Sequence, residues 1–252
     1  MTCTATRSET TGAFFDIDGT LLPAPSLEWR LIGYLLERDE ISTAHVARWL
    51  ARFTGTFWHD LHGATESNKC YLCGISEALV NDWERSLEPT FDFLPFFDEA
   101  LQRIAWHHSQ HHRVFLVSGT LAPLARVVAR YLAAWTSAEI EMCATELELA
   151  PGSPRIWSGR IIGEPMSGGV KLRALRTIAA RYGLDLARCY AYGDSAGDQQ
   201  MLEAVGHGIA VNPTRRLARV ARKRGWQRYA WEKSFREMPI AAPRRMASQA
   251  AR

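Results

Sequence analysis

The sequence lacks any uninterrupted apolar run of about eighteen residues, the length that a membrane-spanning helix requires. Residues 1–11 are polar and lack the apolar centre of an export signal, so we expect a cytoplasmic protein with no membrane span. Cysteine is scarce, and its odd count of five predicts free thiols in a reducing compartment. Internal repeats and low-complexity segments are missing as well. These absences argue against membrane-spanning, disulfide-stapled and repeat proteins.

The composition is that of a globular protein with one unusual end. The chain has 252 residues, 47% hydrophobic and 23% charged, which suffices for a full core in one domain with an insert. Residues 213–252 hold twelve Lys or Arg against two Glu, so the net charge of +3 leaves the other 212 residues at −7. A basic end attracts nucleic acid or anionic membranes. It lacks the regular aromatic interleaving of single-strand binding surfaces, so we expect a solvated helix face and no nucleic-acid partner.

Most of the chain alternates between short apolar runs and helical patterns. Strands are predicted at 13–15, 113–117, 189–192 and 209–210, and helices at 97–107, 121–134, 171–182 and 199–205. Strands separated by helices imply parallel crossovers, hence an α/β fold with a doubly wound, Rossmann-like sheet. Ser158-Gly159 predicts the turn of a small β-hairpin within residues 156–162, and Gly183 predicts a helix cap.

The stretch from residue 27 to 88 has a different pattern. Apolar residues at helical spacing, such as Leu31, Leu35, Trp49 and Phe53, predict two to four helices inserted after the first strand. We therefore divide the chain into an α/β core (1–22 and 90–230), a helical cap (23–89) and a basic tail (231–252).

Three predicted strands end in polar, loop-forming motifs: Asp-Ile-Asp-Gly-Thr at 16–20, Ser-Gly-Thr at 118–120, and Gly-Asp-Ser-Ala-Gly-Asp at 193–198. The carboxyl ends of parallel strands share one edge of a sheet, where ligands bind. That edge would hold four carboxylates, Asp16, Asp18, Asp194 and Asp198. Clustered carboxylates repel one another unless a cation lies among them, and all-oxygen ligands favour Mg²⁺.

The same edge offers groups suited to phosphate. Ser118 and Gly119 precede a predicted helix, so a hydroxyl and backbone N–H groups would lie at a helix N-terminus. Lys171 opens its own helix after Gly168-Gly169 and would reach the same edge. Carboxylates, a cation and phosphate ligands together indicate phosphoryl chemistry.

These four motifs, in this order, resemble those of the haloacid dehalogenase superfamily of hydrolases. The spacing is similar to its phosphoserine-phosphatase-like branch (subfamily IB), in which a helical cap follows the first motif. The runs 144–148 (Ala-Thr-Glu-Leu-Glu) and 157–161 (Trp-Ser-Gly-Arg-Ile) also resemble that branch. The resemblance covers about residues 12–226.

The resemblance implies a role for each motif residue. Asp16 would be the nucleophile that forms an aspartyl phosphate, and Asp18 the general acid and base. Asp16, the backbone carbonyl of Asp18, and Asp194 would ligate Mg²⁺, while Asp198 would orient Lys171 or a metal-bound water. The phosphate-binding set would be Ser118, Gly119, Thr20 and Lys171.

The cap departs from the phosphoserine phosphatases. Those enzymes place a glutamate soon after the first motif to bind the substrate amine, whereas Pro25 and Ser26 stand here and Glu28 follows a few residues later. This difference argues against phosphoserine. Candidate substrate contacts in the cap are Glu28, Arg52, His59 and Lys69. Thr54 to Asn68, where the helical pattern breaks, is expected to face the catalytic edge.

Two further groups invite a metal or redox interpretation that we do not favour. Cys70 and Cys73 have no second cysteine pair or His partner at zinc-finger spacing, so we expect them to pack within the cap. His107, His108, His111 and His112 lie away from the catalytic edge, at a helix end and the loop after it. We expect them to form a solvated, partly protonated turn.

The sequence thus predicts a Mg²⁺-dependent phosphomonoesterase acting on a small phosphorylated metabolite through an aspartyl phosphate on Asp16. One alternative is phosphoryl transfer to an acceptor alcohol, which would use the same residues. The other is a non-catalytic switch that is turned on by phosphorylation of Asp16, which the presence of Asp18 disfavours. The oligomeric state and the identity of the metabolite stay open.

Overall fold

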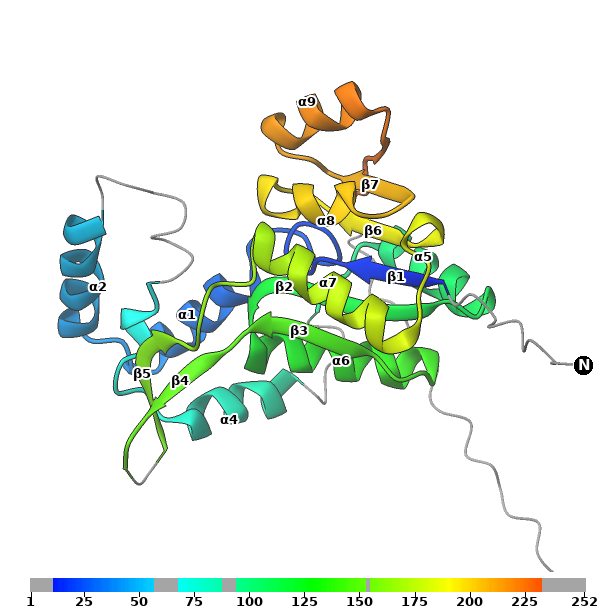
Figure 1. Ribbon diagram of the computed structural model, residues 1–252. Coiled ribbons are helices and arrows are strands. Elements are labelled where there is room, and N and C mark those ends of the chain that lie inside the picture. The colour runs from blue at the N-terminus through cyan, green and yellow to red at the C-terminus, as the bar shows by residue number, and fades with distance from the viewer. Residues whose placement is uncertain (1–10, 57–67, 88–93, 153–154, 233–252) are drawn as a thin grey trace, which may run out of the picture.

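The core of the protein is a parallel sheet of six strands, seen in a computed structural model that describes residues 11–56, 68–87, 94–152 and 155–232 (Figure 1). The strand order is β3-β2-β1-β6-β7-β8. The strands are β1 (Gly12–Phe15), β2 (Arg113–Leu121), β3 (Glu141–Thr145), β6 (Tyr190–Gly193), β7 (His207–Val211) and β8 (Gln227–Tyr229). The predicted doubly wound parallel sheet is confirmed.

The central strand β1 explains why the first apolar run shows no alternation. It pairs with β2 on one side, Phe14 opposite Phe115, and with β6 on the other, Phe14 opposite Ala191. All four residues of β1 are buried because both faces of the sheet are covered by helices. Phe14 and Phe15 point into different clusters of the core, one on each face.

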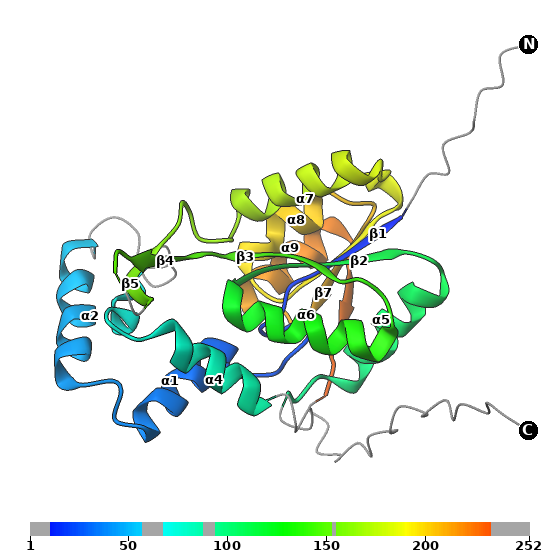
Figure 2. The same ribbon diagram turned by 90° about the horizontal axis from the view of Figure 1, so that it is seen from below.

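Helices cover both faces of this sheet (Figures 1 and 2). One face carries α7 (Gly169–Tyr182), α8 (Gln199–Glu203) and α9 (Arg215–Arg224), whose apolar residues pack with Phe14. The other face carries α5 (Asp98–Ser109) and α6 (Ala122–Thr136), which pack with Phe15. As predicted, Gly183 caps α7 with a left-handed conformation, φ 63°.

The cap lies beyond the carboxyl ends of the strands and consists of α1 (Leu27–Glu37), α2 (Thr43–Thr56), the 3₁₀ helix η1 (Cys70–Leu72) and α4 (Glu77–Leu87) (Figure 1). A two-stranded antiparallel sheet, β4 (Leu147–Ala150) with β5 (Ile156–Ile161), reaches from the core to this cap. Trp157 N donates to Ile75 O at 2.8 Å, and Gly74 N donates to Trp157 O at 3.0 Å. The core is thus joined to the cap by the hydrogen bonds of β5 as well as by the covalent connections of the chain.

The predicted hairpin exists, but its predicted turn was wrong. Ser158 and Gly159 lie inside β5, and the hairpin turns between Ala150 and Ile156 instead. Gly159 has φ 78°, and a Cβ there would lie 2.9 Å from Cys73 Cβ. The glycine is required because η1 packs directly on the strand. The Ser-Gly pair has the local sequence of a turn, and this long-range contact cannot be inferred from it.

The histidine prediction was wrong for His107. This side chain is fully buried, with Nε2 2.8 Å from Tyr192 Oη and Nδ1 2.9 Å from His112 Nδ1. Burial, with smaller contributions from His112 and Arg103, lowers the pKa of His107 to about 3, so its ring is neutral at pH 7. His108 and His111 are exposed, as expected of a turn.

Three strands were not predicted at all: the edge strand β3, the short strand β8 at the other edge, and β4 of the small hairpin. Trp231, just after β8, packs near Phe97 and Tyr192 and exchanges two hydrogen bonds with Asn212. No helix in the described ranges is long and apolar enough to cross a membrane. Cys70, Cys73, Cys143 and Cys189 are present as thiols.

Candidate active site

Motifs far apart in the chain meet where β1, β2 and β6 end. Asp16 N donates to Tyr192 O at 3.0 Å, which continues the pairing of β1 with β6 into the first motif. The side chains of Asp16, Asp194 and Asp198 each place one carboxylate oxygen within 4.8 Å of the other two. The structure therefore brings together three of the four carboxylates that the sequence placed at this edge.

Lys171 lies inside this group of acids. It enters from the first turn of α7, after the positive-φ residue Gly168, and its side chain is 4% exposed. Its Nζ is 2.6 Å from Asp16 Oδ1 and 2.5 Å from Asp198 Oδ1. Burial lowers the pKa of Lys171, but the two carboxylates outweigh this and raise it, so the ammonium is charged.

Asp198 uses both carboxylate oxygens within the protein. Oδ1 accepts from Lys171, and Oδ2 accepts from Asp194 N at 3.1 Å, Ser195 N at 2.9 Å and Ser195 Oγ at 3.0 Å. The side chain is fully buried. Asp198 thus fixes both the lysine and the loop that carries Asp194, a geometry suited to the predicted supporting position.

Two glycines allow the acidic group to be this compact. Gly19 has φ 84°, and a Cβ at this position would lie 2.5 Å from Asp194 Oδ2. A Cβ at Gly193 would lie 2.4 Å from the Cβ of Asp198. Any larger residue at either position would push an acid out of the group.

The charges of this group fit a divalent cation. Burial above all, with Asp198 adding to it against the opposing charge of Lys171, raises the pKa of Asp16 to about 7. Burial, then Asp16 and Asp198, raises the pKa of Asp194 to about 8. One lysine does not balance three acids, of which Asp16 and Asp198 are buried and Asp194 half-buried, and Mg²⁺ ligated by carboxylate oxygens would do so. The donor set thus suits the predicted ion.

Asp18 lies next to this group but its carboxylate is held elsewhere. Oδ1 accepts from Leu27 N, the first residue of α1, at 2.8 Å, and Oδ2 accepts from Thr120 Oγ1 at 2.7 Å. Burial raises the pKa of Asp18, while the two hydrogen bonds lower it by less. A carboxyl group with a raised pKa is suited to carrying a proton near neutral pH.

The predicted phosphate-binding residues fall into two groups. Ser118 and Gly119 line the cavity at the end of β2, and Ser118 Oγ is 2.9 Å from Thr120 Oγ1. Gly119 O accepts from Thr145 Oγ1 at 2.9 Å, which fixes the end of β2 against β3. Thr20 is fully buried, does not line the cavity, and its hydroxyl has no hydrogen-bond partner within the described ranges.

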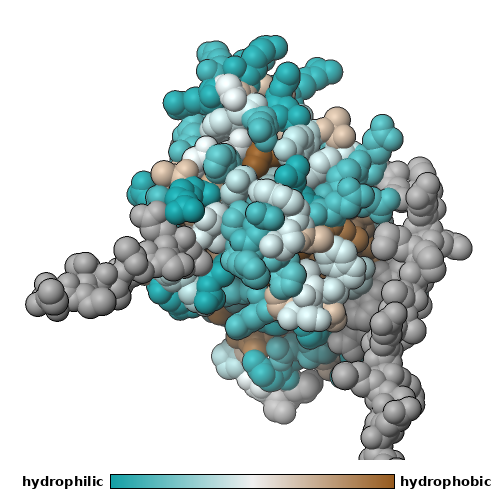
Figure 3. Space-filling view, turned by 90° about the vertical axis from the view of Figure 1, so that its right-hand side faces the viewer, coloured by the Kyte–Doolittle hydropathy of each residue, from teal (hydrophilic) through white to brown (hydrophobic). Residues whose placement is uncertain are grey.

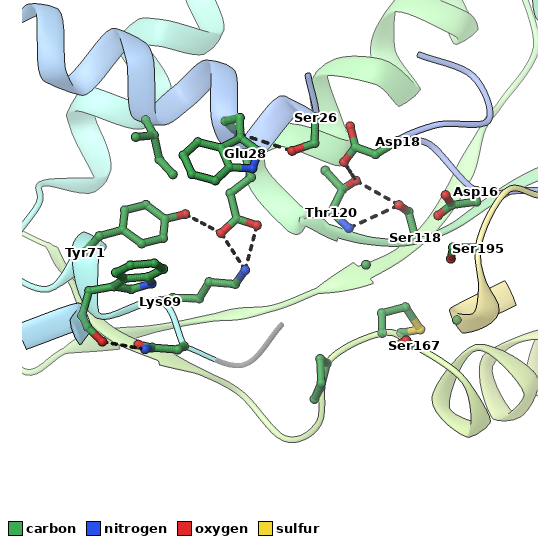
Figure 4. Close-up of a pocket in the computed structure, with 18 of the residues that line it drawn as sticks. Asp16, Asp18, Ser26, Glu28, Lys69, Tyr71, Ser118, Thr120, Ser167 and Ser195 are labelled. Atoms are coloured by element: carbon green, nitrogen blue, oxygen red, sulfur yellow. Dashed lines mark hydrogen bonds and ion pairs between the residues drawn. The ribbon is translucent and has the colours of Figure 1, made fainter. Parts of the chain in front are cut away.

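A single cavity of about 760 Å³ connects these residues to the cap (Figure 4). Its core end is lined by Asp16, Asp18, Ser118, Gly119, Thr120, Lys171, Asp194 and Ser195. Its cap end is lined by Glu28, Trp29, Ile32, Leu36, Ile41, Val46, Trp49, Asn68, Lys69 and Tyr71. A substrate bound at the core end would therefore have room to extend into the space between α1 and α2.

Glu28 and Lys69, two of the weaker candidates, form an ion pair in this cavity (Figure 4). Lys69 Nζ lies 2.6 and 2.7 Å from the two carboxylate oxygens, and Tyr71 Oη donates to Glu28 Oε1 at 2.7 Å. His59 lies outside the described residues, as does the side chain of Arg52 within α2. Both therefore stay predictions.

Several cavity residues were missed by sequence reasoning, among them Thr120, Tyr71 and Trp29. Thr120 belongs to the Ser-Gly-Thr motif, but its hydrogen bond to Asp18, 102 residues away in the chain, forms only in the folded protein. Tyr71 and Trp29 were not among the predicted substrate contacts. The amphipathic spacing of Trp29, Ile32 and Leu36 was a usable signal, since one helical face carries all three.

Comparison with known proteins agrees with this geometry. A family model described as haloacid dehalogenase-like hydrolase matches residues 13–203. The phosphoserine phosphatase SerB1 of Mycobacterium tuberculosis is 31% identical over 226 residues, 86% of this chain and 70% of the relative. The inhibition of morphological differentiation protein of Streptomyces azureus is 32% identical over 229 residues, 86% of this chain and 76% of the relative.

Solved structures share the fold. A protein of unknown function from Bordetella pertussis has a TM-score of 0.71 at 25% identity, covering 88% of this chain and 99% of its own. A phosphoserine phosphatase in its apo form has a TM-score of 0.59 at 19% identity, covering 91% and 97%. Motif order, fold and family model agree: the chain belongs to the haloacid dehalogenase-like hydrolase family and is an enzyme of the phosphatase type.

Proposed function

We propose that this protein is a Mg²⁺-dependent phosphomonoesterase that hydrolyses a small phosphorylated metabolite through an aspartyl phosphate on Asp16. The observation that carries the proposal is the position of Lys171 Nζ, 2.6 Å from Asp16 and 2.5 Å from Asp198, beside Asp194 at the floor of the cavity. The buried ammonium is suited to binding the phosphate of a substrate, and the excess of acids is suited to binding a cation.

In the first step, a carboxylate oxygen of Asp16 attacks phosphorus, the bond from phosphorus to the ester oxygen breaks, and Asp18 gives its proton to the departing alkoxide. Ser118 Oγ and Gly119 N, with Lys171, would hold the phosphoryl oxygens at the floor of the cavity. Thr20 is too buried to share this role directly, so we propose that it supports the loop after β1.

In the second step, ionised Asp18 takes a proton from water, whose oxygen attacks phosphorus and displaces the Asp16 carboxylate. Phosphate leaves, and both acids return to their starting states. One residue serves both steps because the first leaves it ionised. The raised pKa of Asp18, caused by its burial, supports the first role.

Mg²⁺ would be held by Asp16, Asp194 and the backbone carbonyl of Asp18. When bound it supplies positive charge that offsets the acids and the phosphate. Asp198, with both oxygens bonded to the protein, would act through Lys171 and the loop at Asp194.

Two alternatives use the same residues. In phosphoryl transfer to an acceptor alcohol, the second step would require that alcohol instead of water. In a switch, the phosphoryl group would persist on Asp16, which the proximity of Asp18 opposes. Phosphoserine, named for several relatives, is a candidate substrate, although the Glu28 carboxylate that would face its amine is already paired with Lys69. We also propose a reducing compartment such as the cytoplasm, because the few, scattered cysteines of the sequence favour free thiols.

A screen of phosphorylated metabolites tests the proposal. Phosphate release is measured with Mg²⁺ and with the ion chelated, for the wild type and for Asp194→Asn. We expect release that requires Mg²⁺, and a higher Mg²⁺ requirement for the variant. Release that continues under chelation would contradict the metal assignment, and release that requires an added alcohol would favour phosphoryl transfer.

A further inference from the structure

We infer that the substrate's leaving alcohol carries an extended apolar group, an alkyl chain or a comparable hydrocarbon, that lies between α1 and α2. This inference rests on the proposed phosphomonoesterase and names its substrate class. It follows from the lining of the cap end of the cavity, from the pairing of its polar groups and from the cavity's size.

The cap end of the cavity has two apolar walls. Trp29, Ile32 and Leu36 line it from α1 at a spacing of three and four residues, and Val46 and Trp49 line it from α2 at a spacing of three. Ile41, between the helices, contributes as well. The α1 wall begins one residue beyond Glu28 and lines the same cavity as Asp16. A substrate with its phosphoryl group at the floor of the cavity would therefore direct its ester group toward these apolar walls.

Several of these apolar side chains are exposed to the cavity opening. Trp29 is 63% exposed, Leu36 51% and Val46 44%. Among the described residues, four of the seven large hydrophobic side chains that are exposed belong to α1 and α2, the fourth being Leu50. The face of the molecule turned away from the cap is mostly hydrophilic (Figure 3). Grouped exposed apolar side chains beside a catalytic site mark a ligand-binding surface.

The polar groups of the cap end are already bonded to one another. Lys69 and Tyr71 both bind the Glu28 carboxylate. Asn68 Nδ2 donates to Trp49 O at 3.0 Å, and Asn68 Oδ1 accepts from Cys70 N at 3.2 Å. A zwitterionic amino-acid phosphate would have to separate the Glu28–Lys69 pair and expose both charges again. An apolar group requires no such rearrangement.

The cavity is also larger than a small polar metabolite needs. Its volume of about 760 Å³ falls within the range of roughly 300–1,000 Å³ that encloses ligands of drug size. A phosphoryl group at the floor fills only one end. The remaining volume suits a chain of several methylenes, each of which leaves water on binding.

The test compares kcat/KM for ethyl, butyl, hexyl and octyl phosphate with that for phosphoserine, all kept below micelle-forming concentrations with Mg²⁺ present. We expect kcat/KM to rise two- to fourfold per methylene, where fourfold corresponds to about 0.8 kcal/mol for full burial. Trp29→Ala should lower the ratio of octyl to ethyl phosphate at least tenfold. Trp135→Ala, which removes a tryptophan that is 40% exposed on α6 outside the cavity, is the matched control and should leave that ratio unchanged.

Titration calorimetry of octyl phosphate binding to the Asp16→Asn variant provides a second measurement, which does not depend on turnover. If ethyl phosphate is hydrolysed and kcat/KM does not rise with chain length, or if phosphoserine is preferred over octyl phosphate, the inference is overturned while the proposed phosphomonoesterase function stands. An equal loss by Trp29→Ala on every ester also overturns it. Failure to hydrolyse any of the esters removes the proposed function together with it.

Discussion

Two buried lysines lie in one cavity, and their surroundings differ in charge. Lys171 faces Asp16 and Asp198, with Asp194 beside them, so negative charge exceeds positive charge at the core end. Among the described residues, Lys69 pairs with Glu28, which also accepts a hydrogen bond from Tyr71, so the described charges at the cap end are balanced. An unbalanced group requires a ligand or ion to be stable when fully ionised, whereas a balanced pair is complete without one. Charge balance therefore separates the two ends into reactive and recognition surfaces.

The largest effect should come from the core end. Asp16→Asn should lower phosphate release by at least about 10⁴-fold, because the amide is not a nucleophile for phosphorus. Steady-state phosphate release with Mg²⁺ measures the change. Asp82→Asn, an exposed acid on α4, is the matched control and should keep the wild-type rate. A near-native rate for Asp16→Asn would remove the proposed nucleophile.

A smaller loss is expected at Asp18. Asp18→Asn removes the proton carrier and should slow at least one of the two steps by about 10²–10⁴-fold. Acid-quenched reactions with labelled substrate would show whether label accumulates on the protein. Thr120→Val, which removes one hydrogen bond to Asp18, should cost about tenfold. Equal losses for Asp18→Asn and Thr120→Val would argue that Asp18 only positions the loop.

Substitutions in the balanced Glu28–Lys69 pair should lower the stability of the protein more than substitutions in the unbalanced acidic group. Glu28→Gln and Lys69→Met should each lower the free energy of unfolding by about 2 kcal/mol, discounted for the 23% exposure of the Glu28 side chain. The double variant should lose less than the sum of the two, because neither charge is then left alone. Urea unfolding measures all three, and additive losses would show that the pair is not coupled.

A buried base on the face of the sheet that α5 covers sharpens the comparison, because it carries no charge at pH 7. The folded pKa of His107 is lowered to about 3, below its unfolded value of about 6.5. As pH falls from 6 to 4 the unfolded chain takes up this proton and the folded one does not, so stability falls. Relative to His107→Gln, the wild type should lose about 1.4 kcal/mol per pH unit.

Urea unfolding at several pH values measures this difference. The exposed His108 offers a matched control, since His108→Gln should leave the pH dependence of the wild type unchanged. A pH dependence that is the same with and without His107 would mean that the buried ring takes up a proton in the folded state.

The sequence was sufficient to predict the core end of the site. Asp16 and Asp194 directly follow β1 and β6, and Ser118 lies near the end of β2, so parallel topology alone brings all three to one edge. The central strand was also readable, because burial on both faces makes Phe14 and Phe15 part of a continuous apolar run.

The cap end was not predictable in the same way. Glu28 and Lys69 are 41 residues apart, and no strand register relates α1, which carries Glu28, to Lys69 just before η1. Ser158-Gly159 has the local sequence of a turn, but the glycine instead permits close packing against Cys73. His107 looked like part of a polar turn because its partner, Tyr192, lies 85 positions away.

The contact between Asp18 and Thr120 has a consequence for how the site handles a proton. Either hydroxyl can be the donor between Thr120 and Ser118, which are 2.9 Å apart. When Asp18 is ionised, Thr120 donates to it. When Asp18 carries the proton on that oxygen, the Thr120 hydroxyl must reverse and can donate to Ser118 instead. In the proposed mechanism, the direction of the hydrogen bonds of these two hydroxyls would therefore differ between the step in which Asp18 is protonated and the step in which it is ionised.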